Sequence, residues 1–192
     1  MSKTVTIYQT LDDNGKPDIV RRDGPFKCTW DNSWLGHGYY FWETFLQNAH
    51  WWGKARLNGN YMIAQATCVL NDEKIFDLVG NTQHLLDLER YIHEIRKGAF
   101  IKTTETTMSQ VFHFIKNQIK EFKYEATRAY GIDSISMSMH SDHIYRMFFE
   151  EKLKAYIDLK PAIQICLYAK NACSFSNWEL IYPETYLDEG YF

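Results

Sequence analysis

The feature that most constrains this chain is a glycine-bracketed turn that runs directly into an aromatic segment, Trp-Leu-Gly-His-Gly-Tyr-Tyr-Phe-Trp-Glu at residues 34–43. Gly36 and Gly38 allow the backbone a positive φ or a close approach to a ligand. The aromatic residues 39–42 offer a stacking surface immediately after the turn. The segment therefore predicts a strand that either belongs to the core or holds a flat ring.

Length and composition predict a single domain over residues 1–192. The chain of 192 residues fits one domain, and its composition shows no break. Hydrophobic residues make up 45% and aromatic residues 16% of the chain, which is ample for a core. The formal net charge of -3 gives no global electrostatic argument for nucleic acid, although it leaves room for a local basic patch.

The cysteines give no support for a metal site or a disulfide framework. All four lack CxxC spacing, and we expect them to be reduced and mostly buried: Cys28, Cys68, Cys166 and Cys173. The N-terminus has no apolar run after its positive charge, and no stretch reaches the ~18 apolar residues that a membrane span requires. We therefore expect a cytoplasmic protein that does not enter the membrane.

Hydrophobic alternation and turn residues predict the strands. Apart from the aromatic segment, they are expected at residues 4–10, 61–70, 74–78, 124–131, 134–139, 162–168 and 178–182. Residues 61–70 and 74–78 are separated by Asn71-Asp72, which suggests a hairpin. The run 162–168 is almost wholly apolar, as in a strand buried on both faces, and Gln164 interrupts it.

Apolar residues at helical spacing predict helices at about 43–57, 82–97 and 143–155, with another opened by a capping box at 107–110. Thr82 is the expected cap of the second helix. Its inner stripe is expected to be Leu85, Leu88, Ile92 and Ile95. After the capping box, we expect the inward residues to be Val111, Phe114, Ile115, Ile119 and Phe122, and the outward ones Lys116, Lys120 and Lys123. Residues 18–33 predict a loop or a brief helix. Helices inserted between short strands indicate an α+β fold.

The commonest catalytic signatures are absent from the sequence. It contains no GxxxxGK[ST] phosphate loop, no GxGxxG, no HExxH and no GxSxG. None of the cysteines lies at a predicted helix start or in a basic setting that would lower its pKa, which argues against a cysteine nucleophile. Common nucleotide-binding, zinc-protease and serine-hydrolase classes are therefore not indicated.

The segment from Gly36 to Gly53 resembles the second motif of poly(ADP-ribose)-polymerase-like ADP-ribosyltransferases, and especially of small bacterial domains related to them. Gly38-Tyr39-Tyr40-Phe41 is the matching motif. The resemblance implies a split, bent sheet that binds NAD as a substrate between its halves, with Tyr40 stacking on nicotinamide and Gly38, Tyr39 and Phe41 beside it. An aromatic face suits a cationic pyridinium ring, an interaction of roughly 0.5–2 kcal/mol.

The family's first motif, histidine-glycine-threonine or -serine, is matched by Tyr8-Gln9-Thr10, in which only Thr10 agrees. The resemblance implies that Tyr8, Gln9 and Thr10 place the dinucleotide. The third motif is a polar residue, usually glutamate, on a late strand, and Gln164 is the natural occupant. A glutamine supplies the hydrogen bond to the nicotinamide ribose without the charge or the base.

The general base would then come from elsewhere in the chain or from the acceptor itself. Glu43 is the nearest candidate in sequence, and the other carboxylates considered are Glu150, Glu151 and Asp158. Arg128 lies in a strand-like segment, where it either pairs with a carboxylate or binds an anion such as the diphosphate. Trp51 and Trp52 are expected in the core or along the pocket.

The resemblance implies a mono-ADP-ribosyltransferase that modifies a macromolecule, either protein or nucleic acid. Small relatives act as toxins of toxin-antitoxin or phage-defence systems, which makes an antitoxin protein an expected partner. Two alternatives stay open. One is a catalytically degenerate module of the same fold that only binds, since the family's histidine and glutamate are both replaced. The other is an unrelated α+β interaction protein.

Overall fold

A computed structural model of the chain describes residues 2–98, 106–119, 122–131, 135, 145–151 and 155–187. The strands are β1 (Ser2–Asp12), β2 (Tyr39–Glu43), β3 (Tyr61–Asn71), β4 (Ile75–Asp77), β5 (Ala126–Tyr130), β6 (Arg146–Phe148), β7 (Tyr156–Asp158), β8 (Ile163–Leu167) and β9 (Ser176–Tyr182). The helices are α1 (Pro17–Asp23), α2 (Leu46–Arg56), α3 (Thr82–Lys97) and α4 (Met108–Gln118), and 3₁₀ turns lie at Ala172–Ser174 and Glu184–Tyr186. This mixture confirms the α+β class.

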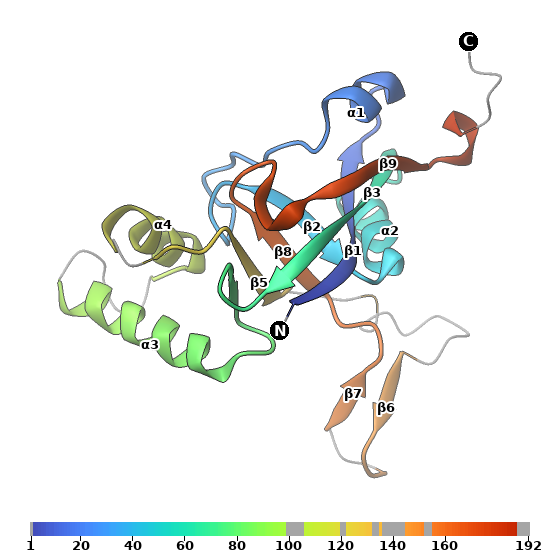
Figure 1. The fold of residues 1–192 in the computed structure, drawn as a ribbon. Coiled ribbons are helices and arrows are strands. Elements are labelled where there is room, and N and C mark those ends of the chain that lie inside the picture. The colour runs from blue at the N-terminus through green and yellow to red at the C-terminus, as the bar shows by residue number, and fades with distance from the viewer. Residues whose placement is uncertain are drawn as a thin grey trace.

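Seven strands form one sheet in the order β4-β5-β8-β2-β1-β3-β9 (Figure 1). β1 pairs with β3 along its whole length, whereas it pairs with β2 only at Ile7↔Glu43 and Tyr8↔Trp42. The sheet therefore consists of two halves, β4-β5-β8-β2 and β1-β3-β9, which meet along a narrow strip. We call this strip, residues 7–8 and 42–43, the central seam.

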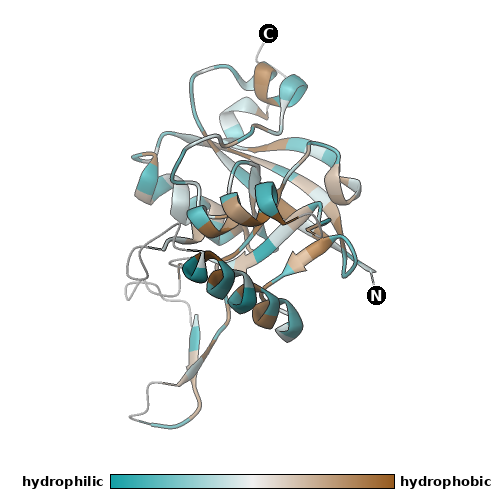
Figure 2. Cartoon of the chain, turned by 90° about the vertical axis from the view of Figure 1, so that its left-hand side faces the viewer, coloured by the Kyte–Doolittle hydropathy of each residue, from teal (hydrophilic) through white to brown (hydrophobic). Residues whose placement is uncertain are grey.

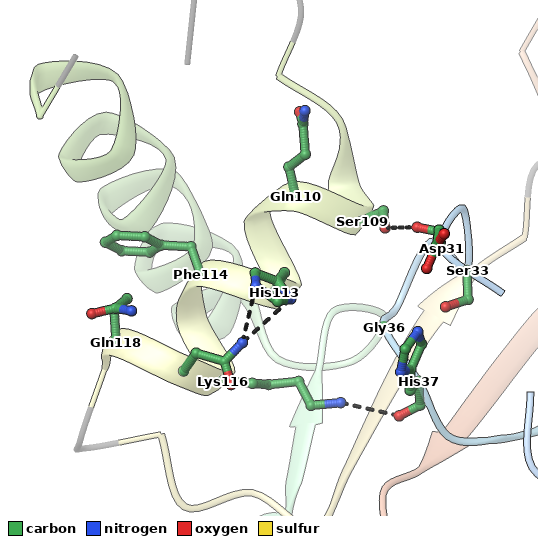
Figure 3. A pocket seen from close by; sticks show the side chains of 11 residues that line it. Asp31, Ser33, Gly36, His37, Ser109, Gln110, His113, Phe114, Lys116 and Gln118 are labelled. Atoms are coloured by element: carbon green, nitrogen blue, oxygen red, sulfur yellow. Dashed lines mark hydrogen bonds between the residues drawn. The ribbon is translucent and has the colours of Figure 1, made fainter. Parts of the chain in front are cut away.

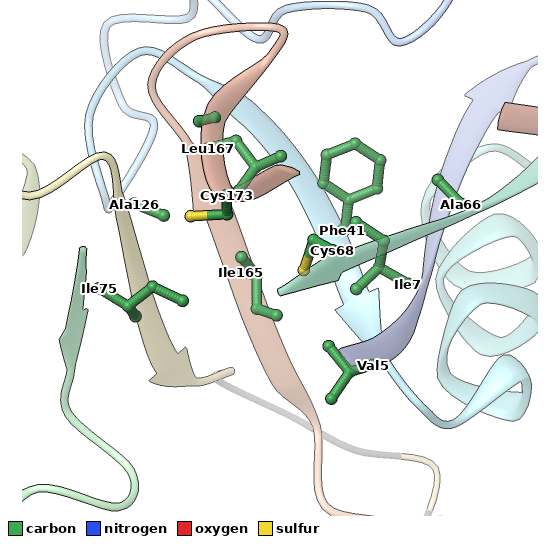
Figure 4. Close-up of a cluster of buried hydrophobic side chains, with 11 residues drawn as sticks. Val5, Ile7, Phe41, Ala66, Cys68, Ile75, Ala126, Ile165, Leu167 and Cys173 are labelled. Atoms are coloured by element: carbon green, nitrogen blue, oxygen red, sulfur yellow. The ribbon is translucent and has the colours of Figure 1, made fainter. Parts of the chain in front are cut away.

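The two faces of the sheet carry different side chains, because successive residues of a strand point to opposite sides. One face is covered by α2, α3 and α4 and is called the helix-covered face. The other face carries a cluster of apolar residues from six strands and the 3₁₀ turn after β8 (Figure 4): Val5, Ile7, Phe41, Ala66, Cys68, Ile75, Ala126, Ile165, Leu167, Ala172 and Cys173. All five residues of β8 are buried, which confirms the prediction of a strand buried on both faces.

Helices α3 and α4 begin at capped residues. Thr107 and Gln110 form the predicted capping box of α4, with both reciprocal hydrogen bonds present. The cap of α3 is Asn81, and the prediction of Thr82 was wrong by one residue, because the Asn81 side chain accepts the backbone N–H of Gln83. Figure 2 shows hydrophobic and hydrophilic residues alternating along α3.

The predicted inner faces of these helices need three corrections. Leu85 is 45% exposed, because the turn of α3 buries His84 in its place. Phe112 is fully buried in α4, whereas Phe114 is only half-buried. Lys116 does not lie outside, since its ammonium group donates a hydrogen bond to the His37 carbonyl. Lys120 lies outside the described residues.

The helix predicted at 43–57 begins three residues later, at Leu46. Glu43 is still the last residue of β2, and Thr44 has a φ of +63°, which a helix does not accommodate. Gly59, the expected stop, has a φ of +80° just beyond the end of α2. The brief helix expected within 18–33 is α1, which starts at Pro17.

Two topological predictions were wrong. β3 and β4 form no hairpin, because β3 pairs on its two sides with β1 and β9, and β4 instead pairs in parallel with β5. The region predicted as a helix at 143–155 contains β6, which pairs with β7 across a turn. Cross-strand packing stabilises this hairpin, since the Phe148 and Tyr156 rings lie 5.9 Å apart. The strand predicted at 134–139 lies, apart from residue 135, outside the described residues.

Candidate functional site

The sheet brings one residue of each of the three sequence motifs onto the same face. Tyr8 of β1 pairs with Trp42 of β2, and Trp42 pairs with Gln164 of β8. Directly paired residues of neighbouring strands point to the same side of a sheet. Tyr40, two residues before Trp42, points to that side as well. The helix-covered face thus carries Tyr8, Tyr40 and Gln164, and the row Tyr8–Trp42–Gln164 crosses the central seam.

Gln164 is a buried amide with unused hydrogen-bonding capacity. Its Oε1 accepts a hydrogen bond from Nε1 of Trp34 at 3.0 Å, although 130 residues separate the two in sequence. Within the described ranges, its side-chain N–H groups meet no acceptor. Trp34 was not predicted as a site residue, although it is the first residue of the glycine-bracketed segment 34–43.

Tyr8 lies at the other end of the row, beside an aromatic group from α2. It packs with Trp42, Trp51 and Trp52, and the Trp42 and Trp52 rings lie 5.8 Å apart. Partial burial raises the pKa of the Tyr8 hydroxyl, which therefore remains a neutral donor. Among the described residues this hydroxyl has no hydrogen-bond partner. Both ends of the row thus offer an unused polar group.

The hydroxyl of Tyr40 forms hydrogen bonds with the backbone of the glycine turn. It accepts the backbone N–H of Leu35 at 2.9 Å and donates to the Gly36 carbonyl at 2.8 Å. Burial, and then the neighbouring Cys166, raise the pKa of Tyr40, which keeps the hydroxyl protonated. The hydroxyl is therefore engaged by the turn, while the ring packs beside Cys166 and Tyr168.

Glu43 and Arg128 point to the opposite face of the sheet and bind each other. The guanidinium group of Arg128 donates to both Glu43 oxygens, at 2.6 and 3.1 Å, and also to Asp77. Although burial alone would lower it, these contacts raise the pKa of Arg128. Of the two possibilities for Arg128, pairing with carboxylates is the one observed. Because the Glu43 carboxylate binds Arg128 on the opposite face, it does not point toward the row.

The remaining residues predicted around the dinucleotide have structural partners. The Thr10 hydroxyl donates to the Ala49 carbonyl of α2, and the Gln9 side chain bonds to the backbone of Phe26. Phe41 is fully buried on the opposite face, where Tyr39 packs against the same cluster. A Cβ at Gly38 would lie 2.6 Å from the Leu167 carbonyl, so this position accepts only glycine.

The alternative carboxylates lie far from the row in the fold. Glu150 and Glu151 are exposed in the turn after β6, and Asp158 pairs with Arg146 across the hairpin. The β6–β7 hairpin projects away from the seven-stranded sheet (Figure 1). These three residues are therefore not brought to Gln164.

A pocket of about 840 Å³ opens on the outer side of the glycine turn, between residues 31–37 and α4 (Figure 3). Gly36 and His37 line it from the turn, and Ser109, His113 and Lys116 from the helix. Tyr8, Tyr40 and Gln164 do not line this pocket. The sequence signal for it was the turn itself, which faces both the pocket and Tyr40.

Within the part of the chain that the structure describes, no cluster of histidine, cysteine and acidic side chains has the makings of a metal site. The helices of that part are all too short or too polar to cross a membrane. Comparison of the chain with protein-family models, with curated proteins and with solved structures finds no match.

Proposed function

We propose that the chain is an NAD-dependent mono-ADP-ribosyltransferase whose NAD site lies over the row Tyr8–Trp42–Gln164. The observation that carries the proposal is the register of the central strands. Residues from the first, second and third motifs of the resemblance, 156 positions apart from Tyr8 to Gln164, share one face of three adjacent strands. Neighbouring strands lie about 4.8 Å apart, so the row spans about 10 Å, which suits the nicotinamide riboside half of NAD.

The polar groups of the row support the proposal. NAD carries a carboxamide and ribose hydroxyls that need hydrogen-bond partners once water is excluded. The Tyr8 hydroxyl and the side-chain N–H groups of Gln164 have no partner among the described residues and stand at opposite ends of the row. The ring of Tyr40, beside the row, is of the kind that suits a flat cationic ring, whereas the buried ring of Trp42 packs against Trp51 and Trp52 of α2.

In the proposed reaction, the bond between C1′ of the nicotinamide ribose and the pyridinium nitrogen breaks, and its electron pair remains on nicotinamide. A lone pair of the acceptor atom forms the new bond to C1′, and the acceptor releases its proton. Gln164 holds a ribose hydroxyl as positive charge develops on the sugar. Because Glu43 is bound by Arg128 on the other face, we assign the removal of the proton to the acceptor or to solvent.

The acceptor in this proposal is a macromolecule, protein or nucleic acid, in the cytoplasm. The proposed biological role is that of a toxin or phage-defence effector, held in check by an antitoxin protein. Support for the role comes from the resemblance of Gly38-Tyr39-Tyr40-Phe41 to small bacterial ADP-ribosyltransferases. Labelled NAD and bacterial lysate, treated with nuclease or protease after the reaction, identify the class of acceptor.

Nicotinamide release from NAD tests the site. Gln164→Leu and Tyr8→Phe each remove a hydrogen-bonding group with little change of shape, and we expect each to lower the rate about tenfold or more. Gln83→Leu, at an exposed position of α3, is the matched control and should leave the rate unchanged. Release that persists undiminished in both site variants would show that the site is elsewhere.

Two variants of Tyr40 test whether its ring stacks on nicotinamide. Tyr40→Phe keeps the ring and should retain NAD affinity, whereas Tyr40→Ala should weaken it. Circular dichroism checks that both variants are folded, because each loses the hydroxyl that holds the turn. Equal affinity of the two folded variants for NAD would exclude a stacking role.

A second candidate function is NAD binding without turnover. It is favoured by the amide at Gln164, which brings no negative charge to the sugar, and by the engagement of Glu43 with Arg128. Saturable NAD binding that Gln164→Leu weakens, with no nicotinamide release in lysate, would support this function. Absence of NAD binding at millimolar concentration would contradict both candidates and leave an α+β interaction protein.

A further inference from the structure

We propose that the pocket between the glycine turn and α4 binds a phosphate group, carried by a free anion or by a nucleotide. This site is distinct from the row Tyr8–Trp42–Gln164, and the proposal does not depend on ADP-ribosyl transfer. The observation that carries it is Ser33, which lines the pocket and is only 7% exposed.

The hydroxyl of Ser33 lacks a hydrogen bond to any described residue, although it is buried. Its backbone is fully used by the turn: the N–H donates to the Trp30 carbonyl, and the carbonyl accepts from Gly36. Figure 3 shows the hydroxyl oxygen directed to the side of the loop that faces α4. A buried hydroxyl without a partner is unfavourable, so a ligand in the pocket supplies the missing bond.

The walls of the pocket are held in place before a ligand arrives. The Ser109 hydroxyl donates to the Asp31 carbonyl at 3.0 Å, and Lys116 Nζ donates to the His37 carbonyl at 3.1 Å (Figure 3). These two bonds attach the loop to α4 on either side of Ser33. Tyr40 supports the same loop from the sheet side through Leu35 and Gly36. A fixed cavity costs less free energy to occupy than one that must first be ordered.

One basic residue, Lys116, and one acidic residue, Asp31, line the pocket, and the ammonium group of Lys116 is the charge that would hold an anion. Lys116 lies in the wall, with Nζ 3.6 Å from the centre of the Tyr168 ring, and no carboxylate of the described residues pairs with it. Burial lowers its pKa, and the smaller effects of Cys166, which raises it, and of Lys27, which lowers it, oppose each other. His37 and His113 add two imidazole donors, whereas Asp31 is the one acidic residue of the lining.

Geometry and chemistry together favour phosphate over a carboxylate ligand. A phosphate presents several oxygens in different directions, which suits donors that converge from the turn and from the helix. Ser33 and Lys116 approach from different sides, and the amide side chains of Gln110 and Asn117 line the same space.

Isothermal titration calorimetry with inorganic phosphate, adenosine monophosphate and adenosine tests the proposal. Phosphate and the nucleotide should bind saturably and adenosine should not. Tighter binding of the nucleotide than of phosphate would identify a nucleotide as the source of the group, and equal binding would identify the free anion. Saturable binding of adenosine alone, or of none of the three, would overturn the proposal.

Variants then locate the binding site. Ser33→Ala and Lys116→Met should each weaken phosphate binding about tenfold, whereas Lys123→Met, at an exposed lysine outside the pocket, should not. Ser33→Ala removes a hydroxyl that is unpaired in the free protein, so its melting temperature without phosphate should not fall. Phosphate should raise the melting temperature of the natural protein but not that of Ser33→Ala. Equal binding by all three variants would overturn the assignment.

Discussion

The side-chain amide of Gln9 pairs with both backbone polar groups of Phe26. Gln9 Nε2 donates to the Phe26 carbonyl, and the Phe26 N–H donates to Gln9 Oε1, both at 2.8 Å. The pairing occurs where β1 and β2 have diverged beyond the central seam. On the other side of the opening, Cys28 pairs with Gly38 at the start of β2. Residues 26–28 therefore fill the opening between the two halves of the sheet. The Gln9 side chain supplies the hydrogen bonds that the backbone of a neighbouring strand would otherwise make.

Replacing Gln9 should destabilise the fold through this pairing. Gln9→Leu leaves the backbone groups of Phe26 without partners in a partly buried place, and we expect a loss of about 1–3 kcal/mol in the free energy of unfolding. Urea denaturation measures the loss. Gln83→Leu on the exposed surface of α3 should change the free energy by no more than about 0.5 kcal/mol. Similar values for the two variants would contradict a role for the pairing.

The ion pair between Arg128 and Glu43 should contribute far more than a surface pair. The Arg128 side chain is 14% and that of Glu43 5% exposed, so Arg128→Met leaves a buried carboxylate without compensation. We expect a loss of about 3–5 kcal/mol on denaturation. Arg22, whose pair with Asp23 is solvent-exposed, is the control, and Arg22→Met should lower the free energy of unfolding far less than Arg128→Met does.

A double variant separates the loss of the Arg128–Glu43 ion pair from the cost of leaving a buried carboxylate unpaired. Glu43→Gln combined with Arg128→Met removes the charge of Glu43, the more buried of the two carboxylates that Arg128 binds, and it should be more stable than Arg128→Met alone. A double variant that loses the sum of the two single losses would show that the residues act independently.

Thiol reactivity should distinguish Cys28 from the other cysteines. Cys28 is half-exposed, whereas Cys68, Cys166 and Cys173 are buried. Burial raises the pKa of each of these three thiols to about 12, which leaves almost no thiolate near neutral pH. Iodoacetamide should therefore modify the folded protein once, at Cys28, and the unfolded protein at all four positions, as read by mass spectrometry. Early modification of Cys166 in the folded protein would be inconsistent with this structure.

The same thiols should make the protein less stable in alkali. An unfolded thiol ionises near pH 9.0, while burial raises the pKa of folded Cys68 to about 12. Between these values the unfolded state binds fewer protons, so stability is complete below pH 9 and is lost as the pH rises toward 12. Each such thiol contributes a slope of about 1.4 kcal/mol per pH unit.

A pair of variants isolates the contribution of one thiol. Cys68→Ala should flatten the decline of unfolding free energy between pH 9 and 11. Val5, paired with Cys68 on the neighbouring strand, provides the control, since Val5→Ala makes a comparable cavity without removing a titrating group. An unchanged slope in Cys68→Ala would contradict the pKa shift.

Local signals explain what could be predicted from the sequence. The capping box at Thr107 and Gln110 involves two residues on one helical turn. The nearly continuous apolar run 163–167 by itself indicates a buried strand. The hairpin β6–β7 was missed because its stability comes from contacts between strands, which the spacing of apolar residues along one segment does not reveal.

The site could be predicted only in part, for the same reason. The shared face of Tyr8 and Gln164 follows from strand order and register, which single-strand patterns do not fix. Trp34 and Gln164 are 130 residues apart, and Arg128 and Glu43 are 85 apart. Nothing in the local sequence of either partner identifies the other. The pocket beside Ser33 likewise depends on the meeting of a turn and a helix that are distant in sequence.

The narrowness of the central seam has a mechanical consequence. Each half of the sheet is stiffened by longer ladders, along the whole of β1 and β3 on one side and over five pairs between β5 and β8 on the other. β1 and β2 pair at two positions, so much of what joins the halves is side-chain packing in the cluster that contains Val5 and Ile165. Tyr8 belongs to one half and Gln164 to the other. A ligand that touches both side chains would therefore act as a brace across the sheet.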